Sequence, residues 1–248
     1  MNPKMTRRAF LKALTGTGIT VAITATSIYY LIEASKKKEP ASPSSSSSPS
    51  SSSSPSPSPS PSSRLPPGQY KVEQLIVLNI DGIPGFDEKT WNFQVYGLVN
   101  NPFALNYEQF KALPKIGSIS DFHCVTGWSK LDNNWEGVRF RTIMETAQVS
   151  ETAKFATIEC DGGYTTSLPL EDLSIDNVLL AYGLDGKDLP PQNGGPLRIV
   201  VPNKYGYKNA KWVRKLKFTQ TQELGYWEVR GYSNTADPFL NDRYANVP

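Results

Sequence analysis

The chain has 248 residues, of which 20% are charged, and its formal net charge is +3. Its single histidine excludes the histidine-rich cages that hold zinc, copper or non-haem iron, and its two cysteines are too few for a disulfide scaffold or a four-thiolate iron–sulfur site. The length allows one domain of ordinary size or two small ones, and it is sufficient to bury a hydrophobic core.

The positive charge lies at the N-terminus. Residues 1–63 contain seven basic and two acidic side chains, whereas residues 64–248 contain 19 basic and 21 acidic ones. The larger part of the chain is therefore slightly acidic, and the sequence predicts no surface for binding nucleic acid.

Residues 1–35 have the features of an export signal. Residues 6–12 match the twin-arginine pattern S/T-R-R-x-F-L-K at every position, and an uncharged stretch follows over residues 13–32. Because that stretch approaches the ~20 residues that span a bilayer, an ordinary transmembrane anchor is the alternative. No convincing A-x-A cleavage site precedes Lys36, so an uncut signal would anchor the chain in the membrane. We expect export by the twin-arginine route to the periplasm or to the outer face of the cell membrane.

Residues 36–64 are predicted to be a linker. Residues 40–63 consist of 16 serines, 7 prolines and one alanine, and such a segment has no large apolar side chain that would repay the entropy of ordering. Alternating Ser-Pro favours extended polyproline II at about 3.1 Å per residue, so the linker would span on the order of 70 Å. We interpret it as a spacer between a membrane and a globular domain.

Residues 65–248 are predicted to form one strand-rich α+β domain. Apolar runs and alternating patterns predict strands at residues 75–79, 91–97, 155–159, 178–182, 197–201, 212–218 and 226–232. Helices are predicted at residues 107–113, where Pro114 ends the helix, and at residues 138–147. Because the strands do not alternate regularly with long helices, a doubly wound parallel sheet is not expected.

The most informative stretch is Asp-Phe-His-Cys-Val-Thr-Gly-Trp-Ser at residues 121–129. It places the Cys124 thiol beside His123, which as a cation would lower the pKa of the thiol and favour the thiolate that binds soft metals. Three other interpretations are open from the residues alone. They are a buried inert cysteine, a disulfide with Cys160 in an exported protein, and a nucleophilic pair of Cys124 and His123.

This stretch resembles the sulfite-oxidase family of molybdopterin enzymes. The pattern Cys-Val-x-Gly-Trp-Ser begins at Cys124, and Trp-x-Gly-Val follows at residues 135–138. Further segments of the family pattern lie in the expected order at residues 97–99, 161–164, 193–198 and 205–212. The resemblance covers about residues 66–218 and is closest to the bacterial exported branch that includes periplasmic protein-methionine-sulfoxide reductases. It implies a molybdopterin-binding domain of the sulfite-oxidase type.

The resemblance also assigns roles to single residues. It implies that Cys124 ligates molybdenum beside the two dithiolene sulfurs of molybdopterin, which excludes a disulfide between Cys124 and Cys160. It places Tyr164 in the substrate pocket. The residues that it assigns to cofactor binding are His123, Cys124, Asn193, Arg198, Asn209, Ala210 and Lys211. Asn193 stands where many family members carry histidine, whereas the methionine-sulfoxide-reductase branch tends to carry asparagine.

The implied activity is two-electron oxygen-atom transfer by an oxidoreductase. The acidic domain favours reduction of a neutral S-oxide over oxidation of sulfite, unless Arg139 and Arg141 lie at the site. The chain contains neither a C-x-x-C-H haem motif nor a Rossmann fingerprint, so a separate haem protein or quinol-linked partner is expected to exchange the electrons. About thirty residues follow Phe218, too few for the additional dimerisation domain of animal and plant sulfite oxidases, so a monomer is expected.

Two alternative functions belong to other classes. A membrane-tethered binding module would keep the fold without the metal, and a thiol-redox protein would use Cys124 and Cys160. The presence of Cys124, Arg198 and Lys211 together favours the enzyme over the binding module.

Overall fold

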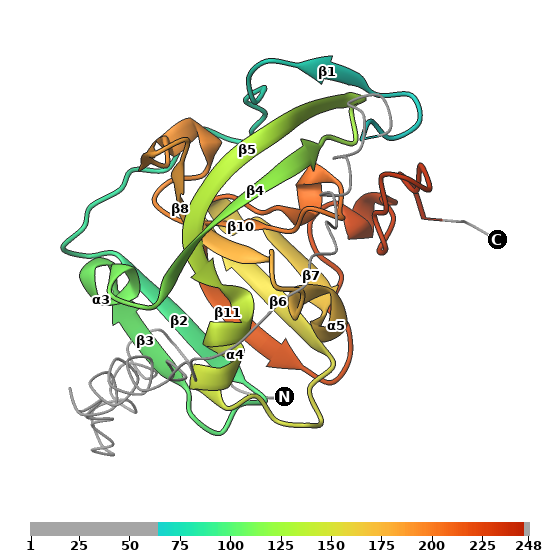
Figure 1. Cartoon of the computed structure of the whole chain (residues 1–248). Helices are drawn as coiled ribbons and strands as arrows, with labels where there is room; N and C mark the ends of the chain where they lie inside the picture. The colour runs from blue at the N-terminus through green and yellow to red at the C-terminus, as the bar shows by residue number, and fades with distance from the viewer. Residues whose placement is uncertain (1–63, 246–248) are drawn as a thin grey trace, which may run out of the picture. The chain divides into compact units, whose positions relative to one another are not determined.

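The computed structural model describes residues 64–245. The predicted export signal at residues 1–35, and the predicted linker at residues 36–64 except Arg64, lie outside this range. Arg64 forms ion pairs with Asp121 and Asp132, so its side chain is already part of the folded domain. Within the described range the chain forms two sheets and several short helices (Figure 1), which confirms the predicted strand-rich α+β class. No helix among residues 64–245 is both long enough and apolar enough to cross a membrane.

The first sheet has six strands, in the order β1–β5–β8–β10 with β4 paired to β5 and β9 paired to β8. Its strands are β1 (Tyr70–Val72), β4 (Lys115–His123), β5 (Trp128–Arg139), β8 (Leu179–Leu184), β9 (Lys187–Asp188) and β10 (Arg198–Val200). The β4–β5 hairpin dominates the sheet because β5 is long enough to pair with β1, β4 and β8 at once. Its turn holds Cys124 and Gly127, and Gly127 has a φ of +102°, a conformation that side chains disfavour.

The second sheet has five strands in the order β3–β2–β11–β6–β7. They are β2 (Asn92–Gly97), β3 (Phe103–Asn106), β6 (Phe155–Cys160), β7 (Thr165–Pro169) and β11 (Val213–Thr219). Alternation along β2 puts Phe93 and Val95 in the core and the residues between them nearer the surface, as the sequence pattern predicted. Only β2 and β11 pair in parallel in this sheet; the other pairs are antiparallel.

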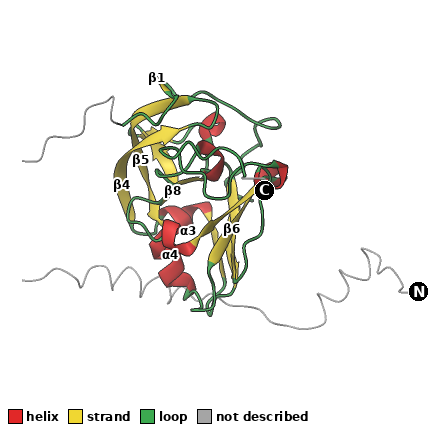
Figure 2. Cartoon of the chain, turned by 90° about the vertical axis from the view of Figure 1, so that its right-hand side faces the viewer, coloured by secondary structure: helices red, strands yellow, loops and turns green. Residues whose placement is uncertain are grey.

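Short helices join the strands. The α-helices are α3 (Tyr107–Lys111), α4 (Phe140–Ala147) and α5 (Leu170–Leu173), and the 3-10 turns are η2 (Asp161–Gly163), η3 (Pro191–Asn193), η4 (Gly206–Lys208) and η5 (Glu228–Arg230). Asn106 caps α3 by accepting a hydrogen bond from the Gln109 amide, and α4 buries Phe140 and Ile143. In Figure 2 the β4–β5 hairpin lies on one side of the domain and β6 on the other, with α3 and α4 between them.

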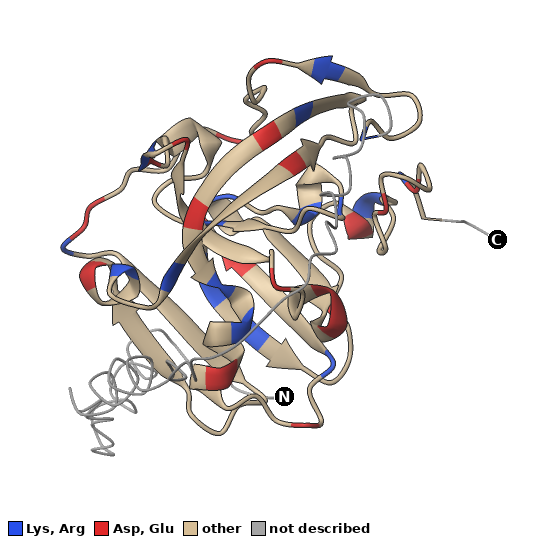
Figure 3. Cartoon of the chain, viewed as in Figure 1, with Lys and Arg blue, Asp and Glu red and all other residues tan. Residues whose placement is uncertain are grey.

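Acidic and basic residues are both scattered over the described elements (Figure 3). Several ion pairs join exposed partners, such as Lys115 with Glu136 and Arg141 with Asp176. The prediction that the domain does not bind nucleic acid stays a prediction, since nothing in the fold tests it.

The structure corrects three of the predicted elements. Residues 75–79 form no strand but an irregular segment, and residues 226–232 form a loop around η5. Residues 138 and 139 end β5, so α4 begins later than predicted, at Phe140. The two wrong strands share a cause, because their large apolar and aromatic side chains line a cavity instead of pairing in a sheet.

The sequence missed β4 and β5, the longest strands. Within these strands Ser120, Ser129 and Asn133 are buried whereas Ile119 is exposed, so apolar and polar residues do not alternate with the period of two that predicts a half-buried strand. Their pairing with each other over the length of a hairpin stabilises strands that local propensity does not predict.

Candidate functional site

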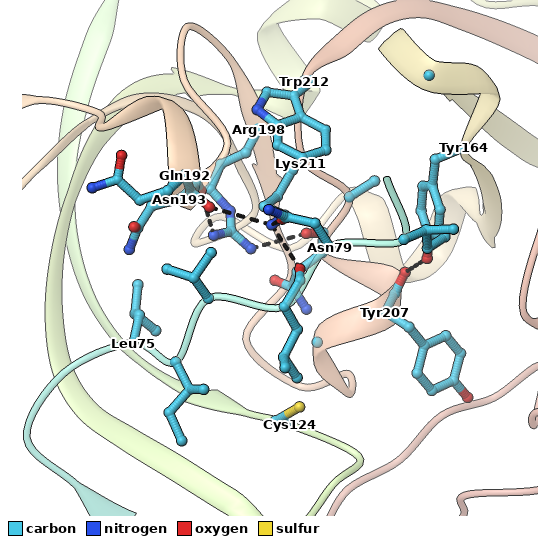
Figure 4. A pocket seen from close by; sticks show the side chains of 18 of the residues that line it. Leu75, Asn79, Cys124, Tyr164, Gln192, Asn193, Arg198, Tyr207, Lys211 and Trp212 are labelled. Atoms are coloured by element: carbon cyan, nitrogen blue, oxygen red, sulfur yellow. Dashed lines mark hydrogen bonds between the residues drawn. The ribbon is translucent and has the colours of Figure 1, made fainter. Parts of the chain in front are cut away.

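A cavity of about 810 Å³ lies where the loops of the two sheets meet (Figure 4). Four parts of the chain line it: the irregular segment at residues 75–84, the β4–β5 turn, the loops around η2 and η3, and the chain from η4 to Tyr232. Of the eight predicted site residues, seven line this cavity and His123 does not. The tertiary fold therefore gathers residues that are spread over almost ninety positions of sequence.

Cys124 sits in the β4–β5 turn with its sulfur at the cavity wall. Its amide donates to the carbonyl of Trp128 over 2.8 Å, and its own carbonyl accepts from Gly127 over 3.1 Å, so the turn is fixed on both sides. Its Sγ lies 3.1 Å from the Thr126 hydroxyl. Burial raises the pKa of the Cys124 thiol, against the hydrogen bond to Thr126 and the charge of Arg243, which lower it. A metal cation at the sulfur would displace the thiol proton, and the Thr126 hydroxyl would then donate to the thiolate.

Cys124 and Cys160 are both free thiols. Cys160 is buried at the end of β6 and is not among the residues that line the cavity, and burial raises its pKa above the ordinary thiol range. The two cysteines are therefore not paired in this structure, and only Cys124 lines the cavity.

His123 lies behind the cavity wall. Its ring packs edge-on against Phe239 at 5.5 Å, and its Nδ1 is 2.8 Å from the Ser129 hydroxyl. Ser129 donates its only hydroxyl proton to Gln69 over 2.7 Å, so His123 Nδ1 must be the donor to Ser129. Gln69 in turn donates to the carbonyl of Cys124 over 3.0 Å. His123 thus supports the Cys124 turn through two side chains, and its contact with a cofactor stays a prediction.

Arg198 is a buried cation that has no carboxylate partner among the described residues. Its two terminal nitrogens donate to the carbonyls of Asn193 (2.8 Å) and Asn209 (2.9 Å), and its guanidinium lies 5.3 and 5.1 Å from the ring centres of Phe122 and Trp135. Its Nε is buried without a hydrogen-bond partner. Burial lowers the pKa of Arg198 to about 10. A buried cation with a donor to spare is costly alone and favours an anionic ligand beside it.

Lys211 is the second cation of the cavity. Its Nζ donates to the Leu78 carbonyl over 2.8 Å, to the Gln192 carbonyl over 3.2 Å and to the Asn79 side chain. Burial, together with the charge of Arg198, lowers the pKa of Lys211 to about 8. Lys211 therefore ties the segment at residues 75–84 to the rest of the site.

Gly194 allows the two cations to come together. It adopts a φ of +111°, and a Cβ at this position would lie 2.9 Å from the Lys211 side chain and 3.0 Å from that of Arg198. Any other residue would push one of the two cations away. The turn at Gly194 is therefore a place where the side chains of Arg198 and Lys211 approach the backbone closely.

Asn209 and Ala210 stabilise the loop between β10 and β11, a role that the sequence did not predict. The Asn209 side chain accepts from the Val201 amide over 2.6 Å and donates to carbonyls of the same loop, so it holds the loop in shape. Its backbone carbonyl is what binds Arg198. The Ala210 carbonyl accepts from Ile199, which joins this loop to β10.

Two sets of lining residues were not predicted from the sequence as part of the site: Asn79, and a group of four aromatic residues. Asn79 lies on the cavity, where it accepts from Lys211, and its only signal was a polar residue at the end of an apolar run. Tyr207, Tyr226, Trp227 and Tyr232 line the side on which Tyr164 lies, and the Tyr164 hydroxyl donates to the Tyr207 carbonyl. The last three of these were assigned to a strand that does not exist.

These residues fit the molybdopterin that the sequence resemblance implies. Among residues 64–245 no group of three or more His, Cys, Asp or Glu side chains could hold a metal, and Cys124 is the only sulfur among the residues that line the cavity. One thiolate suits a metal that arrives with two dithiolene sulfurs of its own. Arg198 and Lys211, with the unpartnered Nε, suit the anionic end of such a cofactor.

Because Lys211 has a pKa of about 8, anion binding to the cofactor-free protein should weaken as pH rises through 8. Sulfate is a suitable probe, because its charge does not change between pH 7 and pH 9. The dissociation constant for sulfate, measured by calorimetry, is expected to rise by about tenfold over that range as Lys211 loses its proton. The variant Lys211→Met should bind sulfate weakly at both pH values. Lys187→Met, a change on β9 outside the cavity, serves as control, and a flat profile for the unmodified protein would contradict this prediction.

Comparison with known proteins gives five likenesses: one protein family, three relatives and one solved structure. Residues 80–227 match a protein family described as the oxidoreductase molybdopterin binding domain. The chain is 45% identical over 184 residues to the uncharacterized oxidoreductase YuiH of Bacillus subtilis, which covers 74% of this chain and 93% of that protein. It is 31% identical over 153 residues to a putative protein-methionine-sulfoxide reductase subunit, YedZ1, of Azospira oryzae, covering 62% of this chain and 58% of the relative.

It is also 31% identical over 179 residues to the protein-methionine-sulfoxide reductase catalytic subunit MsrP of Campylobacter jejuni, covering 65% of this chain and 58% of the relative. The chain thus spans little more than half the length of these two relatives. Among solved structures, the sulfane dehydrogenase SoxCD of Paracoccus pantotrophus superposes with a TM-score of 0.53 at 22% identity, over 57% of this chain and 41% of that one. This last likeness concerns the fold alone.

Proposed function

The chain belongs to the oxidoreductase molybdopterin-binding family and is a molybdenum–molybdopterin enzyme of the sulfite-oxidase type, and on this premise we propose that it reduces thioether S-oxides outside the cytoplasm. Methionine sulfoxide is the first substrate to consider, because two relatives are named for its reduction in proteins. The proposal concerns the direction and substrate of the reaction as well as the residues that carry it.

The distribution of charge around the cavity carries the proposal. Among the described lining residues the cations are Arg198 and Lys211, and in Figure 4 they converge on one side, apart from Tyr164 and Tyr207. The remaining charged lining residues are the carboxylates Asp81 and Asp161. If the two cations hold the cofactor, the aromatic side offers no positive charge to a sulfite anion. A neutral S-oxide needs none.

Arg139 and Arg141 do not alter this balance. Neither lines the cavity, and Arg141 is exposed, where it pairs with Asp176 at 3.0 Å and donates to the Ser174 carbonyl. The condition under which sulfite oxidation would have been favoured is therefore absent from the described site.

The reaction consumes two electrons and two protons. A substrate R₂S=O loses its oxygen and leaves as R₂S, and the oxygen leaves as water. The bound cofactor supplies the two-electron oxygen-atom transfer. In this proposal Cys124 holds the metal, while Arg198, Lys211, Asn79 and the Asn193 turn hold the anionic end of the cofactor.

Tyr164 has a defined protonation state in this scheme. Burial raises the pKa of its hydroxyl well above the usual value, so the group is neutral at every physiological pH. Its hydroxyl donates to the Tyr207 carbonyl, and its side chain lines the cavity. We propose that it orients the substrate or the bound proton donor rather than acting as a base.

Location and partner are proposed from the N-terminal sequence and the relatives. The twin-arginine pattern supports export of the folded holoenzyme, with residues 36–64 as spacer and the domain from about residue 65 outside the cytoplasm. Two relatives are named as subunits, one of them catalytic, which supports a separate electron-transfer partner such as a haem protein or a quinol-linked protein. The catalytic domain itself is proposed to be a monomer.

The test compares S-oxide reduction with sulfite oxidation on holoenzyme made in a host that synthesises molybdopterin. Methionine sulfoxide reduction with a reduced artificial donor and sulfite oxidation with an artificial acceptor are measured per bound molybdenum. We expect kcat/KM for the S-oxide to exceed that for sulfite by at least about a hundredfold, the discrimination of a site built for one polar pattern against another. Sulfite oxidation of equal efficiency contradicts the proposal. Absence of both molybdenum and pterin would favour the metal-free binding module instead.

A further inference from the structure

The aromatic side of the cavity is a continuous wall of five residues. Ring centres lie 5.8 Å apart for Tyr164 and Tyr226, 5.2 Å for Tyr226 and Trp227, 5.0 Å for Trp227 and Tyr232, and 5.4 Å for Tyr232 and Tyr207. The hydrogen bond from the Tyr164 hydroxyl to the Tyr207 carbonyl joins the first and the last residue of this series. All five line the cavity, and four of them are only partly buried, so they present their faces or edges to it. We refer to these five residues as the aromatic wall.

Three of the five come from the chain that follows β11, which has no regular structure apart from η5. This segment packs closely on β7: the Tyr226 amide donates to the Thr165 carbonyl over 2.9 Å. A Cβ on Gly225 would lie 2.4 Å from that same carbonyl, so the approach requires glycine. The segment is therefore packed tightly against β7 where it borders the cavity.

A buried ion pair fixes the wall from behind. Glu228, the residue after Trp227, accepts from Lys208 Nζ over 2.5 Å and from the Thr166 hydroxyl over 2.6 Å, and Lys208 also donates to the Ser167 carbonyl over 3.0 Å. The side chains of Lys208 and Glu228 are 0% and 1% exposed. The pair joins β7, η4 and η5, the elements beside Tyr164, Tyr207 and Trp227.

Such a wall distinguishes apolar groups from anions. Aromatic faces carry partial negative charge and disfavour anions, whereas thioether sulfur and methyl groups pack favourably against aromatic rings. Arg230 stacks on Tyr226 at 3.7 Å and donates to its carbonyl, and it is not among the lining residues. No cation of the described cavity lining belongs to the wall.

We propose that Trp227 is a specificity-determining residue, binding the apolar substituent of the S-oxide against the aromatic wall. Trp227 is central, because it contacts both Tyr226 and Tyr232. The inference rests on the proposed function and adds to it which part of the chain selects among S-oxides. Lys208 and Glu228 are positioning residues that hold Trp227 in place.

The test uses holoenzyme and two S-oxides that differ in apolar bulk, methyl phenyl sulfoxide and dimethyl sulfoxide. Trp227→Ala is expected to lower kcat/KM for methyl phenyl sulfoxide by about 10- to 100-fold, mainly through KM, since it removes most of the apolar contact of one large substituent. For dimethyl sulfoxide the loss should stay below about threefold, because little apolar area is involved. Trp227→Phe should restore most of the preference. Binding of methyl phenyl sulfone, followed by calorimetry, should weaken in parallel and does not depend on turnover.

Val229→Ala is the matched control, because Val229 lies on the same η5 turn, is 61% exposed and does not line the cavity. Rates are expressed per bound molybdenum. If the unmodified enzyme reduces both S-oxides but Trp227→Ala changes both equally or neither, the inference alone is overturned. If the unmodified enzyme reduces neither and oxidises sulfite, the proposed function fails and the inference with it.

Discussion

Replacing Cys124 with alanine is expected to remove molybdenum from the purified enzyme and to lower its turnover by more than about a hundredfold. Loss of a residue that only supports a metal ligand already lowers metal affinity or activity by about 10- to 100-fold, and Cys124 is the proposed ligand itself. In the structure Cys124 supplies the only sulfur among the described lining residues. Alanine removes this soft ligand while leaving the turn intact, because the turn is fixed by backbone hydrogen bonds of residues 124, 127 and 128.

The measurement is molybdenum by mass spectrometry and pterin by fluorescence of the extracted cofactor. Pterin is expected to be retained in part, because Arg198 and Lys211 are unchanged and lie on a different side of the cavity. Cys160→Ala is the control: Cys160 is equally buried, lies outside the cavity lining, and should leave metal content and turnover near their normal values. An active, metal-loaded Cys124→Ala enzyme, or an equal loss in Cys160→Ala, contradicts the assignment.

Replacing Lys208 with methionine is expected to lower the free energy of unfolding by about 3–5 kcal/mol, the cost of leaving a buried charge without its partner. Glu228 would keep Thr166 as donor but lose the ammonium group that lies against it. For a domain of this size the loss corresponds to a fall of about 6–20 °C in Tm. Because Glu228 follows Trp227, discrimination between the bulky and the small S-oxide should also decline in the folded variant.

Lys115→Met is the matched control for this change. Lys115 pairs with Glu136 at 3.1 Å, but both side chains are about half exposed, so its loss should cost less than about 1 kcal/mol. The double variant Lys208→Met/Glu228→Gln should recover part of the stability, since it leaves no buried charge unpaired. Chemical denaturation of the three variants checks these values. Equal effects of Lys208→Met and Lys115→Met would show that the buried pair is not what anchors η5.

The elements that the sequence predicted correctly are those in which local pattern and tertiary environment agree. In β2, β6, β8, β10 and β11, apolar residues alternate or run continuously because each strand is buried on one or both faces, and that burial is visible in the sequence. Helix α3 was likewise predicted, because a helical pattern ends before Pro114. The run at residues 75–79 has the same local pattern, yet its side chains face a cavity. Local pattern records that a segment is apolar and does not record what covers it.

The sequence by itself determined the family pattern around Cys124 and the identity of the two cations, because these are properties of residue type and short spacing. Only the tertiary structure decided that Lys211 binds Leu78 and Asn79, which lie more than 130 positions away. It likewise decided that His123 stays behind the cavity wall, that the Asn209 side chain serves its own loop, and that Trp227 reaches the site. These contacts depend on how two sheets pack and on where buried charges find partners. Long-range packing of that kind leaves no periodic trace in the sequence.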